Sequence, residues 1–226
     1  MSRVWVFDVD DTLYLERDYV QSGLRAVAAW AEREFGVGGV YEAAWGRFLA
    51  GSRSTTLTDV FAAAGRPLDV DETAAAVSAY REHQPDIRLC KDAEVLLEAL
   101  VSSAPVGIIT DGPASSQRAK LRALGLESMA NLIVVTDEHG PGWHKPRLRA
   151  FQHIQTSFCV DPSHCVYVAD NPAKDFTGPK SLGWATVRIA RPLGLHADAL
   201  AEQTEVDVTV TTLTALIVDT QVTGER

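Results

Sequence analysis

The stretch Val4–Tyr14, V-W-V-F-D-V-D-D-T-L-Y, decides how the rest of this chain is interpreted. Its first four residues are apolar and include two valines, which predicts a strand buried on both faces of a sheet. The run then stops abruptly at a group of carboxylates. Because unpaired carboxylates are costly to bury, we expect a cationic group beside them.

Asp8 and Asp10 are two residues apart, so their side chains can point the same way as the strand ends. Such a pair can divide a reaction between a nucleophile and a proton donor. A proton donor that works near neutral pH would need a raised pKa at Asp10, caused by burial and by the neighbouring acids. The same residues also fit an acidic turn after an edge strand, in which Asp11 caps a helix.

Composition narrows the class of protein. The chain has 226 residues, of which 46% are hydrophobic and 23% charged, and its formal net charge is −9. This length fits one large domain, or a core with a smaller insert. The acidic balance argues against a nucleic-acid partner, and no apolar stretch is long enough to span a membrane. An odd number of cysteines without metal-ligand spacing, and an apolar run that breaks at Asp8 before it could be a signal peptide, favour a cytoplasmic location.

Residues 15–87 are predicted to form an all-helical domain. Apolar residues recur there at helical spacing, glycine clusters separate several helical pieces, and no strand pattern interrupts them. The last of these helices is expected to begin at a cap formed by Asp69 or Asp71. Residues 1–14 and 88–226 are predicted to form the remaining, catalytic core domain.

Strand and helix patterns alternate in the second half of the chain. The strands are expected at 105–109, 132–135, 165–169, 186–189 and 206–210. Strands separated by helices form a parallel sheet with right-handed crossovers, so the predicted fold is α/β, a doubly wound Rossmann-like sheet. Ligands bind beyond the carboxyl ends of such strands, and Asp8, Thr110 and Asp170 all fall at those ends.

Four sequence features stand in a fixed order along the chain. They are Asp8-x-Asp10-x-Thr12, Thr110 after an apolar strand, Lys145 before a helix, and the run 170–175, D-N-P-A-K-D. In this order they resemble the motifs of the haloacid dehalogenase superfamily, and within it the phosphatase branch with a helical cap between the first and second motifs. The resemblance covers nearly the whole chain. Ala169 departs from it, since the fourth motif more often begins with Gly, and a modest backbone adjustment is expected there.

The resemblance implies hydrolysis of a small phosphate monoester, such as a sugar phosphate or a nucleotide, through an aspartyl-phosphate. Asp8 would attack phosphorus, and Asp10 would protonate the leaving oxygen and then deprotonate water. Mg²⁺, which prefers oxygen ligands, would bind the Asp8 carboxylate, the Asp10 backbone carbonyl and Asp170. Asp175 would act nearby, on a metal-bound water or on Lys145.

Further residues would hold the phosphoryl group in such an enzyme. Thr110 would offer its hydroxyl, and Asp111 and Gly112 would offer backbone N–H groups at a helix start, with Pro113 as the first helical residue. Lys145 would supply a fixed positive charge to the transition state.

Residues outside the motifs would select the substrate. The variable loop before Lys145 contains Trp143 and His144, which are more often packing residues than substrate contacts. In and beside the helical block, the candidates are Tyr14, Arg17, Arg47 and Arg53.

Other functions stay open. A carbon–halogen hydrolase of the same superfamily needs neither a proton donor nor a metal, so Asp10 and Asp170 argue against it. A phosphomutase would keep both residues. A catalytically silent binding module is a third possibility, and the presence of Asp8, Asp10, Lys145 and Asp170 together argues against it. The sequence indicates neither the identity of the ester nor whether the protein is a monomer or a dimer.

Overall fold

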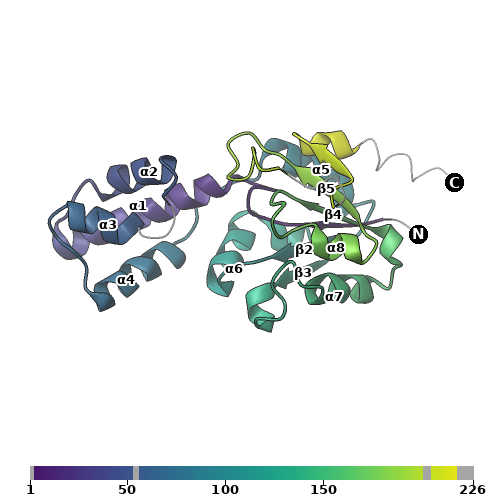
Figure 1. Cartoon of the computed structure of the whole chain (residues 1–226), viewed down its shortest axis with the longest axis horizontal. Coiled ribbons are helices and arrows are strands. Elements are labelled where there is room, and N and C mark those ends of the chain that lie inside the picture. The colour runs from purple at the N-terminus through teal and green to yellow at the C-terminus, as the bar shows by residue number, and fades with distance from the viewer. Residues whose placement is uncertain (1–2, 53–55, 201–204, 218–226) are drawn as a thin grey trace. The chain divides into compact units, whose positions relative to one another are not determined.

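The computed structural model describes residues 3–52, 56–200 and 205–217. The chain forms two compact units (Figure 1). The larger unit comprises the chain up to Arg17 and from Arg88 onward, and the smaller unit comprises Asp18–Ile87. Each unit has a hydrophobic core of its own.

The larger unit is built on a six-stranded parallel sheet, which confirms the predicted α/β class. In spatial order the strands are β3 (Leu132–Val135), β2 (Val106–Thr110), β1 (Val4–Phe7), β4 (Cys165–Ala169), β5 (Ala185–Ile189) and β6 (Val208–Val210). The chain runs outward from β1 to β3 and then returns to the other side of β1 at β4. The direction therefore reverses between β1 and β4, where sheets of this kind bind their ligands. Asp8 and Asp170 follow these two strands directly.

Helices surround this sheet (Figure 1). They are α5 (Lys91–Val101), α6 (Ala114–Ala123), α7 (Arg149–Phe158) and α8 (Thr177–Ser181), with 3-10 turns at Leu126–Ser128, Thr136–His139, Pro162–His164 and Leu213–Leu216. The sequence pattern over 174–182 predicts a longer helix than α8, which begins only at Thr177. The backbone N–H of Asn171 donates to Asp175 Oδ2 and keeps the start of this segment in a loop. The pattern over 213–218 also predicts a short helix. The structure has a 3-10 turn there, and residue 218 lies outside the described residues.

Both faces of β1 are buried. Val4 and Val6 lie in one apolar cluster with Phe151 of α7. Trp5 and Phe7 alternate to the opposite face and are at most 3% exposed. Each such side chain stabilises the fold by about 1.5–3 kcal/mol relative to an exposed position. This burial fixes the end of β1, and with it the backbone of Asp8.

The described secondary structure of the smaller unit consists of helices joined by loops. Its helices are α1 (Glu16–Phe35), which begins in the larger unit, α2 (Val40–Leu49), α3 (Thr56–Ala63) and α4 (Val70–Arg81). Trp30, Phe35 and Phe61 meet edge to face in their core. α4 begins at Asp69, which exchanges hydrogen bonds with Glu72 in a capping box. Across the residues that the structure describes, no helix is long and apolar enough to cross a membrane.

Candidate active site

A buried lysine joins two of the predicted carboxylates. Lys145 Nζ lies 2.7 Å from Asp8 Oδ1, 2.7 Å from Asp175 Oδ1 and 3.0 Å from the Tyr167 hydroxyl. Burial lowers the pKa of Lys145, but the Asp175 and Asp8 carboxylates outweigh it and hold this pKa well above its ordinary value. Lys145 is therefore a cation of the kind expected beside the first motif, and it pairs with the Asp8 carboxylate.

Asp8, Asp170 and Asp175 form an acidic cluster. One carboxylate oxygen from each lies within 4.8 Å of the others, and within the described ranges no other group of three acidic, histidine or cysteine side chains is placed to hold a metal. Burial, reinforced by Asp8 and Asp175, raises the pKa of Asp170 to about 9. Burial also raises the pKa of Asp8 to about 6, although Lys145 opposes it. These hard oxygen donors, with more negative charge than Lys145 can balance, fit Mg²⁺.

The loop after β4 is folded by its own hydrogen bonds. The backbone N–H of Asn171 donates a hydrogen bond to Asp175 Oδ2 at 3.0 Å, and the backbone N–H of Ala173 donates one to Asn171 Oδ1 at 3.0 Å. Arg188 of β5 donates its Nε to the Asp170 carbonyl at 3.4 Å. The Ala169 that replaces the more usual Gly is a buried strand residue, and these contacts form with Ala in that position.

Asp10 contacts a second group of side chains. Lys120 Nζ lies 2.6 Å from Asp10 Oδ1, the Tyr14 hydroxyl donates to the same oxygen, and Gln117 Nε2 donates to Oδ2 at 3.2 Å. Burial raises the pKa of Asp10, but the charge of Lys120 and these hydrogen bonds outweigh it, so the pKa is lowered. The predicted raised pKa of Asp10 is therefore wrong for this structure, because a lysine stands beside the carboxylate.

The end of β2 is held by the same glutamine. Thr110 Oγ1 donates to Gln117 Oε1 at 2.9 Å, and Gln117 Nε2 also donates to the Asp111 carbonyl at 3.0 Å. Gly112 has a φ of +130°, and a Cβ there would lie 2.7 Å from Gln117 Nε2, so a glycine is needed. Pro113 is the N-cap of α6 rather than its first helical residue, which corrects the expectation.

Side chains of the loop before Lys145 make contacts within the protein. The Trp143 ring stacks on His139 with 4.2 Å between ring centroids. His144 Nδ1 lies 3.0 Å from Thr136 Oγ1. Thr136 Oγ1 also donates to Asp111 Oδ1 at 2.6 Å, so His144 is joined to the end of β2 through one hydroxyl.

The other specificity candidates are dispersed. Tyr14 is fully buried in the larger unit, and Arg17 lies in the first turn of α1. Arg47 pairs with Asp59 at 3.2 Å within the smaller unit. Arg53 lies outside the described residues.

Sequence reasoning missed Gln117, Lys120 and Tyr167. Gln117 and Lys120 are three residues apart on α6, which places them on one face of the helix. Both are at most 4% exposed, although α6 is a polar helix. The only signal in the sequence was the run Q-R-A-K shortly after Thr110, and nothing in that run shows that its polar residues are buried.

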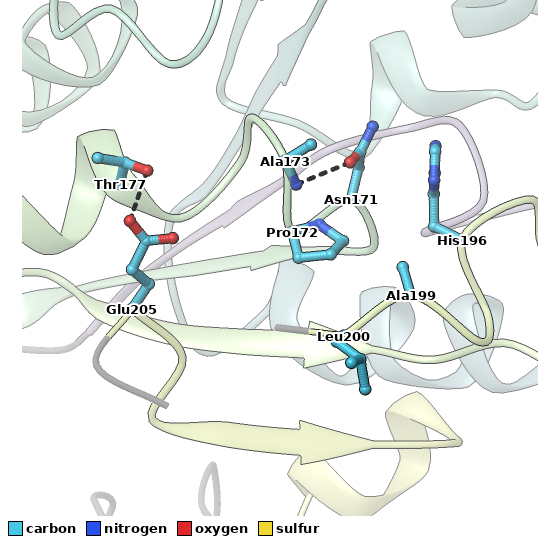
Figure 2. A pocket seen from close by; sticks show the side chains of 8 residues that line it. All are labelled: Asn171, Pro172, Ala173, Thr177, His196, Ala199, Leu200 and Glu205. Atoms are coloured by element: carbon cyan, nitrogen blue, oxygen red, sulfur yellow. Dashed lines mark hydrogen bonds between the residues drawn. The ribbon is translucent and has the colours of Figure 1, made fainter. Parts of the chain in front are cut away.

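A cavity of about 500 Å³ lies beside the loop after β4 (Figure 2). It is lined by Asn171, Pro172, Ala173, Thr177, His196, Ala199, Leu200 and Glu205. Thr177 Oγ1 donates to Glu205 at 2.8 Å on one side of it (Figure 2). None of the three clustered carboxylates lines this cavity. The groups able to attack a substrate or hold a metal lie in the acidic cluster, so the cluster is the better candidate for the reacting centre.

Comparison with known proteins gives the family to which this fold belongs. The family model for haloacid dehalogenase-like hydrolases matches residues 5–189, and the chain belongs to this family. The resemblance to the haloacid dehalogenase superfamily is thereby confirmed, whereas the helical cap stays a prediction.

Individual proteins add detail to this membership. A phosphoserine phosphatase from Thermus thermophilus is 31% identical over 176 residues, which are 77% of this chain and 62% of that protein. A glyceraldehyde 3-phosphate phosphatase from Methanocaldococcus jannaschii is 31% identical over 124 residues, 55% of this chain and 52% of that protein. The matches thus span less than two thirds of the length of either relative. The solved structure of the putative hydrolase YfnB from Bacillus subtilis shares the fold, with a TM-score of 0.71 and 20% identity over 97% of this chain and 98% of that one.

Proposed function

We propose that this protein is a Mg²⁺-dependent phosphatase that hydrolyses a small phosphate monoester through an aspartyl-phosphate on Asp8. The observation that supports it best is the buried Asp8 carboxylate, which is bound by Lys145 and has Asp170 and Asp175 within 4.8 Å. The first two relatives act, by their names, on phosphoserine and on glyceraldehyde 3-phosphate, which are both small phosphate monoesters.

The reaction would proceed in two displacements. In the first, an Asp8 oxygen bonds to phosphorus, the bond to the ester oxygen breaks, and Asp10 gives that oxygen a proton. Because Lys120 lowers the pKa of Asp10, the carboxyl must first be protonated against this charge before it can act as the donor. In the second, Asp10 takes a proton from water, the water oxygen bonds to phosphorus, and Asp8 is released as a carboxylate. When bound by the carboxylates of Asp8 and Asp170 and the Asp10 backbone carbonyl, Mg²⁺ supplies the charge that offsets repulsion between the carboxylate and the phosphate.

Other residues would stabilise the phosphoryl group as it transfers. Lys145 stays charged across neutral pH and is oriented by Asp175, so it offers a fixed cation. Thr110 would exchange its hydrogen bond to Gln117 for one to a phosphoryl oxygen. Asp111 and Gly112 would add backbone N–H groups at the start of α6.

The smaller unit would act as a cap that selects the leaving group. Its helices interrupt the chain after the first motif, and caps of this kind exclude water and admit particular substrates. A sugar phosphate or a nucleotide is the proposed class of ester. A carbon–halogen hydrolase is disfavoured, because halide release needs no metal and would leave Asp170 without a role.

A panel of phosphate esters, assayed with and without Mg²⁺, tests this proposal. We expect hydrolysis of an aryl phosphate and of at least one sugar phosphate or nucleotide, which a chelator abolishes. Asp8→Asn should be inactive on every ester, whereas Asp161→Asn, an exposed aspartate of the same unit, should keep full activity. Full turnover by protein shown to be metal-free by elemental analysis would exclude the metal, and turnover by Asp8→Asn would exclude the nucleophile.

A further inference from the structure

Two side chains of α6, Gln117 and Lys120, hold the Asp10 carboxylate from one side. Lys120 Nζ contacts Oδ1 at 2.6 Å, and Gln117 Nε2 contacts Oδ2 at 3.2 Å. Gln117 is 3% exposed and Lys120 4% exposed. We call these two residues the α6 bracket.

The α6 bracket also reaches the end of β2. The same Gln117 amide accepts a hydrogen bond from Thr110 and donates one to the Asp111 carbonyl. One side chain therefore joins the carboxylate of the first motif to the hydroxyl and the backbone of the second. A rotation of the Gln117 amide would break all three contacts at once.

Burying a lysine on this helix face is expensive, and a purely structural contact with the sheet would be served as well by an apolar residue. Between them, Lys120 and Gln117 engage both oxygens of Asp10, which fixes the direction of its carboxylate. Proton transfer depends steeply on such placement, since a misplacement of about 1 Å can cost on the order of 10²-fold in rate.

We propose that Gln117 and Lys120 are positioning residues. They fix the Asp10 carboxylate for proton transfer and couple it to the phosphate-binding end of β2. This inference rests on the proposed function, in which Asp10 exchanges protons with the leaving oxygen and with water.

The test compares esters whose leaving groups need a proton with one that does not. A nitrophenolate leaves without protonation, whereas a sugar alkoxide needs it. Lys120→Met and Gln117→Met should therefore lower kcat for a sugar phosphate by about 10–100-fold, while formation of phosphoenzyme from nitrophenyl phosphate changes little. Because water activation also needs Asp10, both variants should accumulate phosphoenzyme.

Controls separate positioning from general damage. Arg122→Met removes a basic residue from an exposed part of the same helix and should match the wild type. Lys120→Arg keeps the charge and the donors, so it should restore the wild-type ratio between the two esters. Loss of structure would instead lower both activities in proportion to the fraction of folded protein.

A melting cycle tests the contact without any catalysis. Lys120→Met should lower the melting temperature more in the wild type than in an Asp10→Asn background, where the carboxylate that it leaves unpaired is already neutral. Additive shifts in melting temperature would refute the contact between the α6 bracket and Asp10. Equal losses of activity on both esters in a fully folded variant would refute its positioning role. A wild type that hydrolyses no ester would refute the proposed function and the catalytic role of the bracket, while the melting cycle would still report whether the two residues hold Asp10.

Discussion

Replacing Lys145 with Met should destabilise the protein in a pH-dependent way. The Lys145 side chain has no exposed surface, and it pairs with two carboxylates at 2.7 Å each. Removing one partner of a buried ion pair costs about 3–5 kcal/mol, because the remaining charge is left unpaired. The exposed pair Lys91–Glu94, whose side chains are 80% and 40% exposed, gives a matched control, and Lys91→Met should leave the stability almost unchanged.

The sign of the pH dependence follows from Asp8. Lys145 opposes the burial that raises the pKa of Asp8 to about 6, so its removal should raise that pKa further. A carboxyl whose folded pKa lies above its unfolded value loses stability as the pH rises above the unfolded pKa. The variant should therefore lie closest to the wild type near pH 5 and fall furthest behind it near pH 8.

Urea denaturation of the metal-free protein at pH 5 and pH 8 measures this difference. Added Mg²⁺ should recover part of the lost stability at pH 8, since a cation bound by Asp8 and Asp170 would take over some of the charge balance. A Lys145→Met variant within about 1 kcal/mol of the wild type at pH 8, or one that gains stability as the pH rises, would refute the ion-pair reasoning.

Three further outcomes follow from the structure. Gly112→Ala should cost about 1–3 kcal/mol by thermal denaturation, because its φ of +130° is strained for Ala and its Cβ would meet Gln117, and an unchanged melting temperature would contradict this. Binding of Mg²⁺ at pH 7 should release about one proton, since burial raises the pKa of Asp170 to about 9 and the metal needs the ionised form. Calorimetry in two buffers of different ionisation enthalpy measures the released proton. A binding enthalpy that is the same in both buffers would count against Asp170 as a metal ligand. Arg191→Met should lower the free energy of unfolding in urea by about 3 kcal/mol, because the Arg191 side chain is only 6% exposed and its loss leaves Asp92 without a cation. A loss of stability below about 1 kcal/mol would show that this ion pair is weak.

The fold and the placement of the polar residues could largely be predicted from the sequence. β1 is an unbroken apolar run, and strands alternate with helices after it, so a parallel sheet and its ligand-binding edge follow from general rules. Asp8 and Asp170 end adjacent strands for that reason. The roles assigned to these residues stay predictions.

The surroundings of Asp10 could not be predicted in the same way. Its partner Lys120 is 110 positions away, and its burial depends on how α6 packs rather than on any local pattern. Burial and the neighbouring acids predict a raised pKa for Asp10, whereas the lysine on α6 reverses the direction. The boundaries of a separate helical domain, 15–87, likewise stay a prediction beside the compact unit Asp18–Ile87.

The role of Asp8 as the nucleophile is tested most directly by rapid-quench mass spectrometry with an aryl phosphate. The wild type should form a phosphoenzyme transiently, Asp8→Asn should form none, and Asp10→Asn should accumulate it, because water activation is lost while the attacking carboxylate remains. General acid–base help is worth about 10²–10⁴-fold, so the accumulation should be large. A phosphoenzyme in Asp8→Asn, or normal steady turnover in Asp10→Asn, would contradict the assignment of the two carboxylates.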